Sequence, residues 1–109
     1  MSIAELPISL DEEQIKKFCV SHGIFRMSLF GSVLRDDFDS KKSDVDVFAE
    51  FAPGALRGVG INYFGYGDEL GEILGRKVDF CARLNKYILP KIRREMVTIY
   101  EQPFLDMLS

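Results

Sequence analysis

The chain has 109 residues, of which 47% are apolar and 28% are charged, with a formal net charge of −3 at pH 7. This length predicts a single domain over residues 1–109, and the net negative charge argues against broad binding of duplex nucleic acid. The apolar runs are shorter than the roughly 20 residues of a membrane-spanning helix, and Met1-Ser2-Ile3-Ala4-Glu5 lacks the features of a secretory signal. We therefore expect a cytoplasmic protein with no membrane segment.

The first third of the chain predicts a helix followed by a strand. Ser9 with Glu12 three residues later forms a capping-box pattern, and apolar residues recur at helical spacing up to His22 and Gly23. We expect this helix over residues 10–22, with Gly23 as its stop and His22 facing its C-terminal dipole. Residues 24–30 alternate in a manner typical of a strand.

The middle of the chain predicts a strand over 44–51, a helix over 61–74 and a third strand over 77–82. Seven of the nine glycines lie between Gly54 and Gly75, which weakens the helix pattern without producing a phosphate-binding P-loop. About 25 residues join the second and third strands, enough for a parallel crossover through a helix. The exposed aromatic residues in this segment form either a contact surface or a loop packed over the sheet (Tyr63, Phe64 and Tyr66).

The last segment, from Leu84 to Leu105, carries apolar residues at helical spacing, including Ile92, Met96 and Ile99. Asn85 is a candidate N-cap, while Pro90 favours a start near Leu89. Four basic residues lie on the polar face of this predicted helix, either as a solvated face or as a phosphate or RNA contact (Lys86, Lys91, Arg93 and Arg94). The two cysteines, Cys19 and Cys81, stand in apolar contexts and are interpreted as reduced core residues.

Three aspartates interrupt the predicted strands. Asp44 and Asp46 are two residues apart, so on a strand both carboxylates point to one face while Val45 and Val47 point into the core. Asp79 is a similar charge inside the neighbouring strand. Carboxylates this close together are costly without a cation, and Mg²⁺ is commonly held by a few carboxylates and substrate phosphates. The pattern therefore predicts catalytic and metal-binding roles for Asp44, Asp46 and Asp79.

Gly31 and Ser32 follow the first predicted strand. A glycine at this position permits a phosphate to approach the backbone closely, and a helical turn starting at Ser32 would direct N–H groups and a hydroxyl at that phosphate. Arg35 is a further candidate for phosphate binding, although pairing with Asp37 or Asp39 to hold the loop is an equal alternative. We expect Gly31, Ser32 and Arg35 to contact a nucleoside triphosphate.

These motifs resemble the minimal nucleotidyltransferases of the DNA polymerase beta-like superfamily. The resemblance covers nearly the whole chain, and its motifs are Gly31-Ser32, Asp44-Val45-Asp46 and the Lys77-Val78-Asp79 strand. It implies an α/β nucleotidyltransferase fold, a small mixed β-sheet flanked by helices. It also implies ATP as substrate, two Mg²⁺ ions, and transfer of AMP to a tyrosine of a partner HEPN-domain ribonuclease toxin, with this chain as the antitoxin in a hetero-oligomer.

Two alternatives remain at this stage. The domain could neutralise its partner by contact and keep the aspartates only as a nucleotide or metal sensor. It could also extend RNA, with a terminal ribose hydroxyl as the acceptor in place of a tyrosine. The length of the chain favours the first alternative over the second, because no room is left for a domain that holds a primer.

Overall fold

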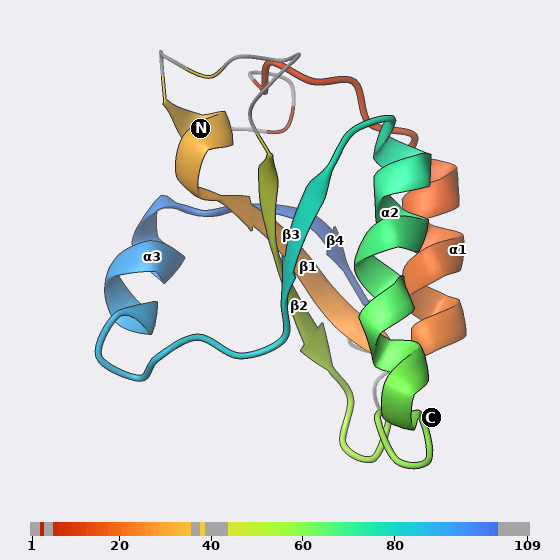
Figure 1. Cartoon of the computed structure of the whole chain (residues 1–109). Helices are drawn as coiled ribbons and strands as arrows, with labels where there is room; N and C mark the ends of the chain where they lie inside the picture. The colour runs from red at the N-terminus through yellow and green to blue at the C-terminus, as the bar shows by residue number, and fades with distance from the viewer. Residues whose placement is uncertain (1–2, 4–5, 36–37, 39–43, 103–109) are drawn as a thin grey trace.

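The structure is a computed structural model that describes residues 3, 6–35, 38 and 44–102. Within this part, four strands form one sheet in the order β3-β2-β1-β4 (Figure 1). They are β1 (Ile24–Phe30), β2 (Val45–Phe51), β3 (Val78–Cys81) and β4 (Val97–Glu101). β2 and β3 are parallel, and β1 is antiparallel to β2 and β4, which confirms the expected mixed sheet and crossover.

Helices lie on both faces of the sheet (Figure 1). α1 (Glu12–His22) and α2 (Tyr66–Leu74) lie side by side on one face, and α3 (Leu89–Glu95) stands off the opposite face. We call this second side the open face of the sheet. Among the described helices, none is both long and apolar enough to cross a membrane.

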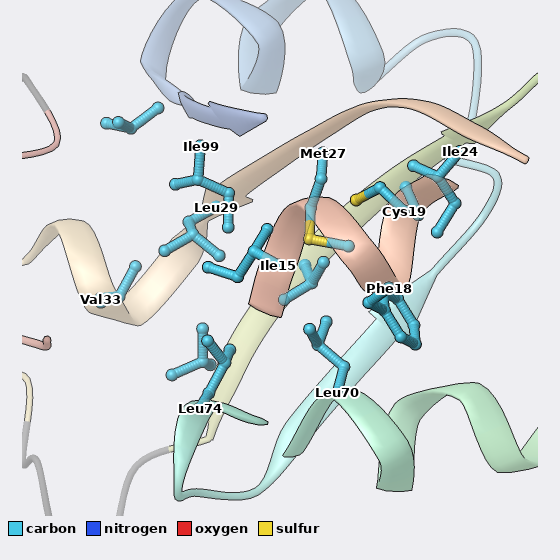
Figure 2. Packing of buried hydrophobic residues seen from close by; sticks show 14 of the residues in the cluster. Ile15, Phe18, Cys19, Ile24, Met27, Leu29, Val33, Leu70, Leu74 and Ile99 are labelled. Atoms are coloured by element: carbon cyan, nitrogen blue, oxygen red, sulfur yellow. The ribbon is translucent and has the colours of Figure 1, made fainter. Parts of the chain in front are cut away.

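The core lies between the sheet and the pair α1 and α2 (Figure 2). Ile15 and Cys19 of α1, Met27 and Leu29 of β1, and Leu70 of α2 are almost fully buried there. Burial of a large apolar side chain stabilises a fold by about 1.5–3 kcal/mol, so this layer dominates the stability of the domain. Cys19 is a core residue as expected, whereas Cys81 is half-buried and lies on the other face of the sheet from this core.

The start of α1 differs from the sequence prediction by two residues. The N-cap is Asp11, whose side chain accepts a hydrogen bond from the backbone N–H of Gln14, so Ser9 does not cap the helix. Aspartate is as good an N-cap as serine, and its position one turn before Ile15 decides the choice. Gly23 ends the helix as predicted, in a left-handed conformation with φ of 72°.

His22, at the C-terminal end of α1 as predicted, also contacts α2. Its ring lies 4.1 Å from the ring of Tyr66 and 4.7 Å from that of Phe18, and its Nε2 is 3.0 Å from Glu69 Oε2. The imidazole therefore holds the two helices together at one end of the core.

The predicted helix over 61–74 is divided in two. Residues Gly60–Gly65 form a 3₁₀ helix, η3, and α2 follows from Tyr66. Of the three aromatic residues here, Tyr66 is buried, Tyr63 is half-buried and Phe64 is 78% exposed. Tyr66 thus packs against the core, whereas Phe64 is exposed, and its role in a contact surface stays a prediction.

The C-terminal part of the described chain contains a strand that the sequence pattern did not predict. α3 ends at Glu95, and β4 pairs with β1 over residues that were assigned to a long helix. Val97, Thr98 and Ile99 are β-branched, and such residues favour strands, whereas the helical spacing of Ile92, Met96 and Ile99 is coincidental. The N-cap position is Ile88, not Asn85, whose side chain instead accepts from the Tyr87 backbone N–H.

Candidate active site

Asp46 and Asp79 are directly opposite each other on adjacent parallel strands. The register pairs the Cα atoms of Asp46 and Asp79, of Val45 and Val78, and of Val47 and Phe80. Paired residues on neighbouring strands direct their side chains to the same face. Val45 and Val47 are fully buried on the core side, so the two aspartates belong to the open face.

Asp44 lies just before this strand pair. The sequence pattern predicts a strand from Asp44, but β2 begins at Val45, and Asp44 is exposed. Strict alternation therefore does not fix the direction of the Asp44 side chain relative to that of Asp46. Both residues have further interactions within the protein.

Gly31 lies directly against the carboxylate of Asp46. β1 ends at Phe30, which is the register partner of Asp46, and Gly31 follows with φ of 73°. A β-carbon at position 31 would overlap Oδ2 of Asp46 and lie 3.1 Å from its Cγ. The need for glycine here arises from the protein's own carboxylate as well as from the backbone conformation, which L side chains rarely adopt.

The other predicted phosphate-binding residues follow Gly31. Ser32 lies in the 3₁₀ helix η2 (Gly31–Leu34), whose Val33 is buried in the core, and Arg35 is exposed directly after it. The helical turn predicted at Ser32 is therefore present. The alternative pairing of Arg35 with Asp37 or Asp39 falls outside the described residues.

The environment of Cys81 also indicates that Asp46 and Asp79 lie on the same face of the sheet. It is two residues beyond Asp79 on β3, opposite Phe48 of β2, and so shares the open face with Asp46 and Asp79. Burial raises the pKa of the Cys81 thiol, and the negative charges of Asp79 and Asp46 raise it further. Both carboxylates therefore lie close enough to the Cys81 thiol to raise its pKa.

An ion-pair network occupies the open face next to these acids. Glu50, whose side chain is only 12% exposed, accepts hydrogen bonds from Arg26 of β1 and from Nη2 of Arg93 at 3.0 Å. The guanidinium of Arg93 also lies 6.0 Å from the ring centroid of Phe48. No residue of α3 is fully buried, so this helix has little apolar packing of its own. The contacts of Arg93 with Glu50 and Phe48 of β2 therefore help to hold α3 against the sheet.

The network was not anticipated from the sequence. Arg93 appeared there only as one of four basic residues on a polar helix face. Glu50 stands four residues after Asp46, on the same side of β2, and that alternation was the available signal for its position.

The carboxylates of this site have the chemistry that a divalent cation requires of its ligands. Aspartate carboxylates are the hard oxygen ligands that Mg²⁺ prefers, and Asp46 and Asp79 are close neighbours on one face. Among the described residues, however, no three acidic, histidine or cysteine side chains converge closely enough to hold a metal ion. Asp46 and Asp79 thus fit such an ion by chemistry and by register, while a convergence of three carboxylates is absent from the part of the chain that the structure describes.

Comparison with known proteins assigns the family. Residues 12–102 match the nucleotidyltransferase domain family. The matched stretch includes both motifs that carry the aspartates and the four described strands. The chain belongs to this family. It is by family a nucleotidyltransferase, an enzyme class that transfers a nucleoside monophosphate group.

One relative of this nucleotidyltransferase is a candidate protein adenylyltransferase of Methanocaldococcus jannaschii. The two are 36% identical over 70 residues, which cover 62% of this chain and 69% of the relative.

Solved structures confirm the fold. A crystal structure of a toxin–antitoxin complex with AMP-PNP aligns with a TM-score of 0.64 and 18% identity, covering 91% of this chain and 80% of that one. A mutant of the toxin–antitoxin MntA–HpeT, with two aspartates changed to glutamate, gives a TM-score of 0.63 at 16% identity over the same shares of the two chains.

Proposed function

We propose that this nucleotidyltransferase transfers AMP from ATP to a tyrosine hydroxyl of a HEPN-domain toxin and thereby acts as its antitoxin. The observation that carries the proposal is the pairing of Asp46 with Asp79 on adjacent strands, with Gly31 against Asp46. ATP as the AMP donor is supported by the relative named as a protein adenylyltransferase and by the similar structure with AMP-PNP. A toxin as the partner is supported by the similar structures that are named as toxin–antitoxin complexes.

In this proposal the triphosphate lies along Gly31 and the start of η2, where backbone N–H groups and the Ser32 hydroxyl donate to its oxygens. Arg35 follows that turn and neutralises part of the phosphate charge. The acceptor oxygen attacks the α-phosphorus in line and forms an O–P bond. The bond from the α-phosphorus to the bridging oxygen breaks, and pyrophosphate leaves.

Asp79 takes the proton of the acceptor hydroxyl, and Asp46 and Asp44 supply the negative charge that selects a cation-bound triphosphate. Two Mg²⁺ ions, held by Asp44, Asp46 and Asp79, would supply charge neutralisation on the phosphates and a lowered acceptor pKa. Because Asp79 lies on the edge strand β3, an acceptor carried by another protein can reach it from outside the sheet.

The test is transfer of label from α-labelled ATP to the cognate partner protein. The double variant Asp44→Asn with Asp46→Asn is expected to lose labelling. Asp68→Asn, which removes an exposed acid from the first turn of α2, is the matched control and is expected to label normally. Equal labelling by the double variant and the wild type would refute the mechanism.

A second candidate follows from the absence of three convergent ligands within the described part of the chain. In this alternative the domain binds a nucleotide and silences its partner by contact. A cell-rescue assay separates the two. If the double variant protects cells from the toxin as well as the wild type does, while it fails to label the toxin, contact alone is sufficient.

A further inference from the structure

A groove runs along the far end of the β2 and β3 pair. In Figure 1 β2 and β3 run side by side and end at the same end of the molecule, opposite the end at which the antiparallel strand β1 finishes. Two adjacent hollows of about 420 and 480 Å³ share Leu56, Ala82 and Arg83. Arg57 also lines the first, and Tyr63, Phe80 and Cys81 line the second. Each hollow is within the roughly 300–1,000 Å³ typical of ligand pockets.

The groove begins close to the aspartates. Cys81 is two residues from Asp79, which is about 6.6 Å along a strand. A chain segment that fills the groove can therefore present its next side chain to Asp79. The hydroxyl of Tyr63, on η3, lies close to Cys81 and to the backbone of Ala82, and these three residues line the second hollow together.

The charge of the groove is positive. Arg57 and Arg83 are exposed on its wall, and neither forms an ion pair with another described residue. Acidic residues are missing from the lining of both hollows. This local charge is opposite to that of the whole chain, whose net charge is −3.

Exposed apolar side chains lie in the groove and on the neighbouring helix η3. Leu56, which lines both hollows, is 37% exposed. On η3, which contributes Tyr63 to the second hollow, Ile61 and Phe64 are 81% and 78% exposed. Large apolar side chains gathered on a surface mark contacts with other proteins. RNA, by contrast, is bound through basic side chains and aromatic stacking, and aliphatic residues such as Leu56 and Ile61 add little to that.

We infer that this groove, which we name the β3-end groove, docks the acceptor segment of the partner protein. The occupant is an acidic peptide segment with a large apolar or aromatic side chain. Its carboxylates pair with Arg57 and Arg83, its apolar side chain packs on Leu56 and Tyr63, and its acceptor tyrosine reaches Asp79. This inference rests on the proposed function for the identity of the acceptor, but the groove's preference for acidic peptides is measurable without any transfer.

The test uses two fluorescein-labelled synthetic peptides that contain Leu-Tyr, one flanked by glutamates and the other by lysines. Binding to the full chain is followed by fluorescence anisotropy. The wild type is expected to bind the glutamate peptide about tenfold more tightly, since two exposed ion pairs are made in one complex and lost in the other. Arg57→Glu with Arg83→Glu is expected to reverse this order.

A matched variant controls for net charge. Lys16→Glu with Lys17→Glu changes the total charge equally on the exposed side of α1 and is expected to keep the wild-type preference. Leu56→Ser is expected to weaken binding of both peptides about threefold without altering their order, because it removes part of an apolar contact.

The outcomes separate the groove from the transfer reaction. Charge-dependent binding of the peptides, together with no transfer of AMP to the cognate partner protein, would support the groove and reject the proposed function. Transfer to both peptides alike, with no effect of the Arg57 and Arg83 reversal, would overturn the groove alone. A short RNA that binds through these arginines in place of the peptides, or a dimer that dissociates on the same reversal, would also overturn it.

Discussion

Gly31 and Asp46 are so close that the glycine α-carbon forms one wall of the carboxylate's environment. A β-carbon at position 31 would overlap Oδ2 of Asp46. The glycine of the Gly-Ser motif therefore fixes where the Asp46 carboxylate lies, in addition to the proposed role of leaving space for a phosphate.

This contact predicts that Gly31→Ala abolishes AMP transfer, because Asp46 must move. The substitution also places alanine at φ of 73°, which costs about 1–3 kcal/mol of unfolding free energy. Gly58→Ala is the matched control, since Gly58 has φ of 74° and no atom within 4 Å of the added carbon. Urea unfolding should show a loss for both variants, and label transfer should fail only for Gly31→Ala. An active Gly31→Ala enzyme would show that Asp46 tolerates displacement.

Removal of the Asp79 carboxylate provides a test of the metal site. Asp79→Asn is expected to lower transfer at least about 100-fold, since a metal ligand or base contributes several kcal/mol. It should also weaken binding of Mn²⁺, a spectroscopic substitute for Mg²⁺, measured by electron paramagnetic resonance in the presence of ATP. Asp68→Asn serves as the control in both measurements. Mn²⁺ binding that is unaffected by Asp79→Asn would exclude this carboxylate as a ligand.

Glu50 is expected to make stability depend on pH. Hydrogen bonds from Arg26 and then from Arg93 hold the pKa of the Glu50 carboxyl below its ordinary value of 4.5. A depressed folded-state pKa stabilises the fold above the unfolded-state pKa, and this stabilisation is lost as the pH falls through the folded-state pKa. Glu50→Gln should lower the unfolding free energy by about 1–3 kcal/mol near neutral pH.

The difference between wild type and Glu50→Gln should shrink as the pH falls from the ordinary pKa of 4.5 through the lower folded-state pKa, because the wild-type carboxyl becomes protonated first in the unfolded and then in the folded state. Urea unfolding at neutral and acidic pH measures it. Glu101→Gln is the control, because Glu101 is 61% exposed and lies 3.9 Å from Arg26, so its substitution should change little. A difference that stays constant with pH would mean that the charge of Glu50 does not stabilise the fold.

The sequence predicted the elements that carry strong local signals. Residues 24–30 were assigned as a strand with the bounds that the structure has, and Asp46 and Asp79 were expected on neighbouring strands and are paired there. That Asp46 lies on the opposite face of β2 from Val45 and Val47 could be predicted without tertiary information, because successive side chains of a strand point to opposite faces.

What the sequence did not reveal depends on contacts distant in the chain. β4 is a strand because its residues pair with β1, and the same apolar residues read in isolation fit a helix. The tie between Glu50 and Arg93 joins residues 43 positions apart, and no local pattern indicates it. The glycines within α2 also depend on a contact distant in the chain, because the space that each one leaves is filled by the segment that leads into and forms β3.

Gly71 permits α2 to lie close to the chain that enters β3. A β-carbon at Gly71 would be 2.9 Å from the carbonyl oxygen of Arg76, whereas Gly65, just before α2, has no atom within 4 Å of such a carbon. Helix propensity alone would favour alanine at position 71 by about 1 kcal/mol. The neighbouring atom is backbone and cannot rotate away, so overpacking of about 1–3 kcal/mol should exceed this gain. We expect Gly71→Ala to lower the urea midpoint and Gly65→Ala to leave it unchanged or raise it. A higher midpoint for Gly71→Ala would mean that α2 can move away from β3 at little cost.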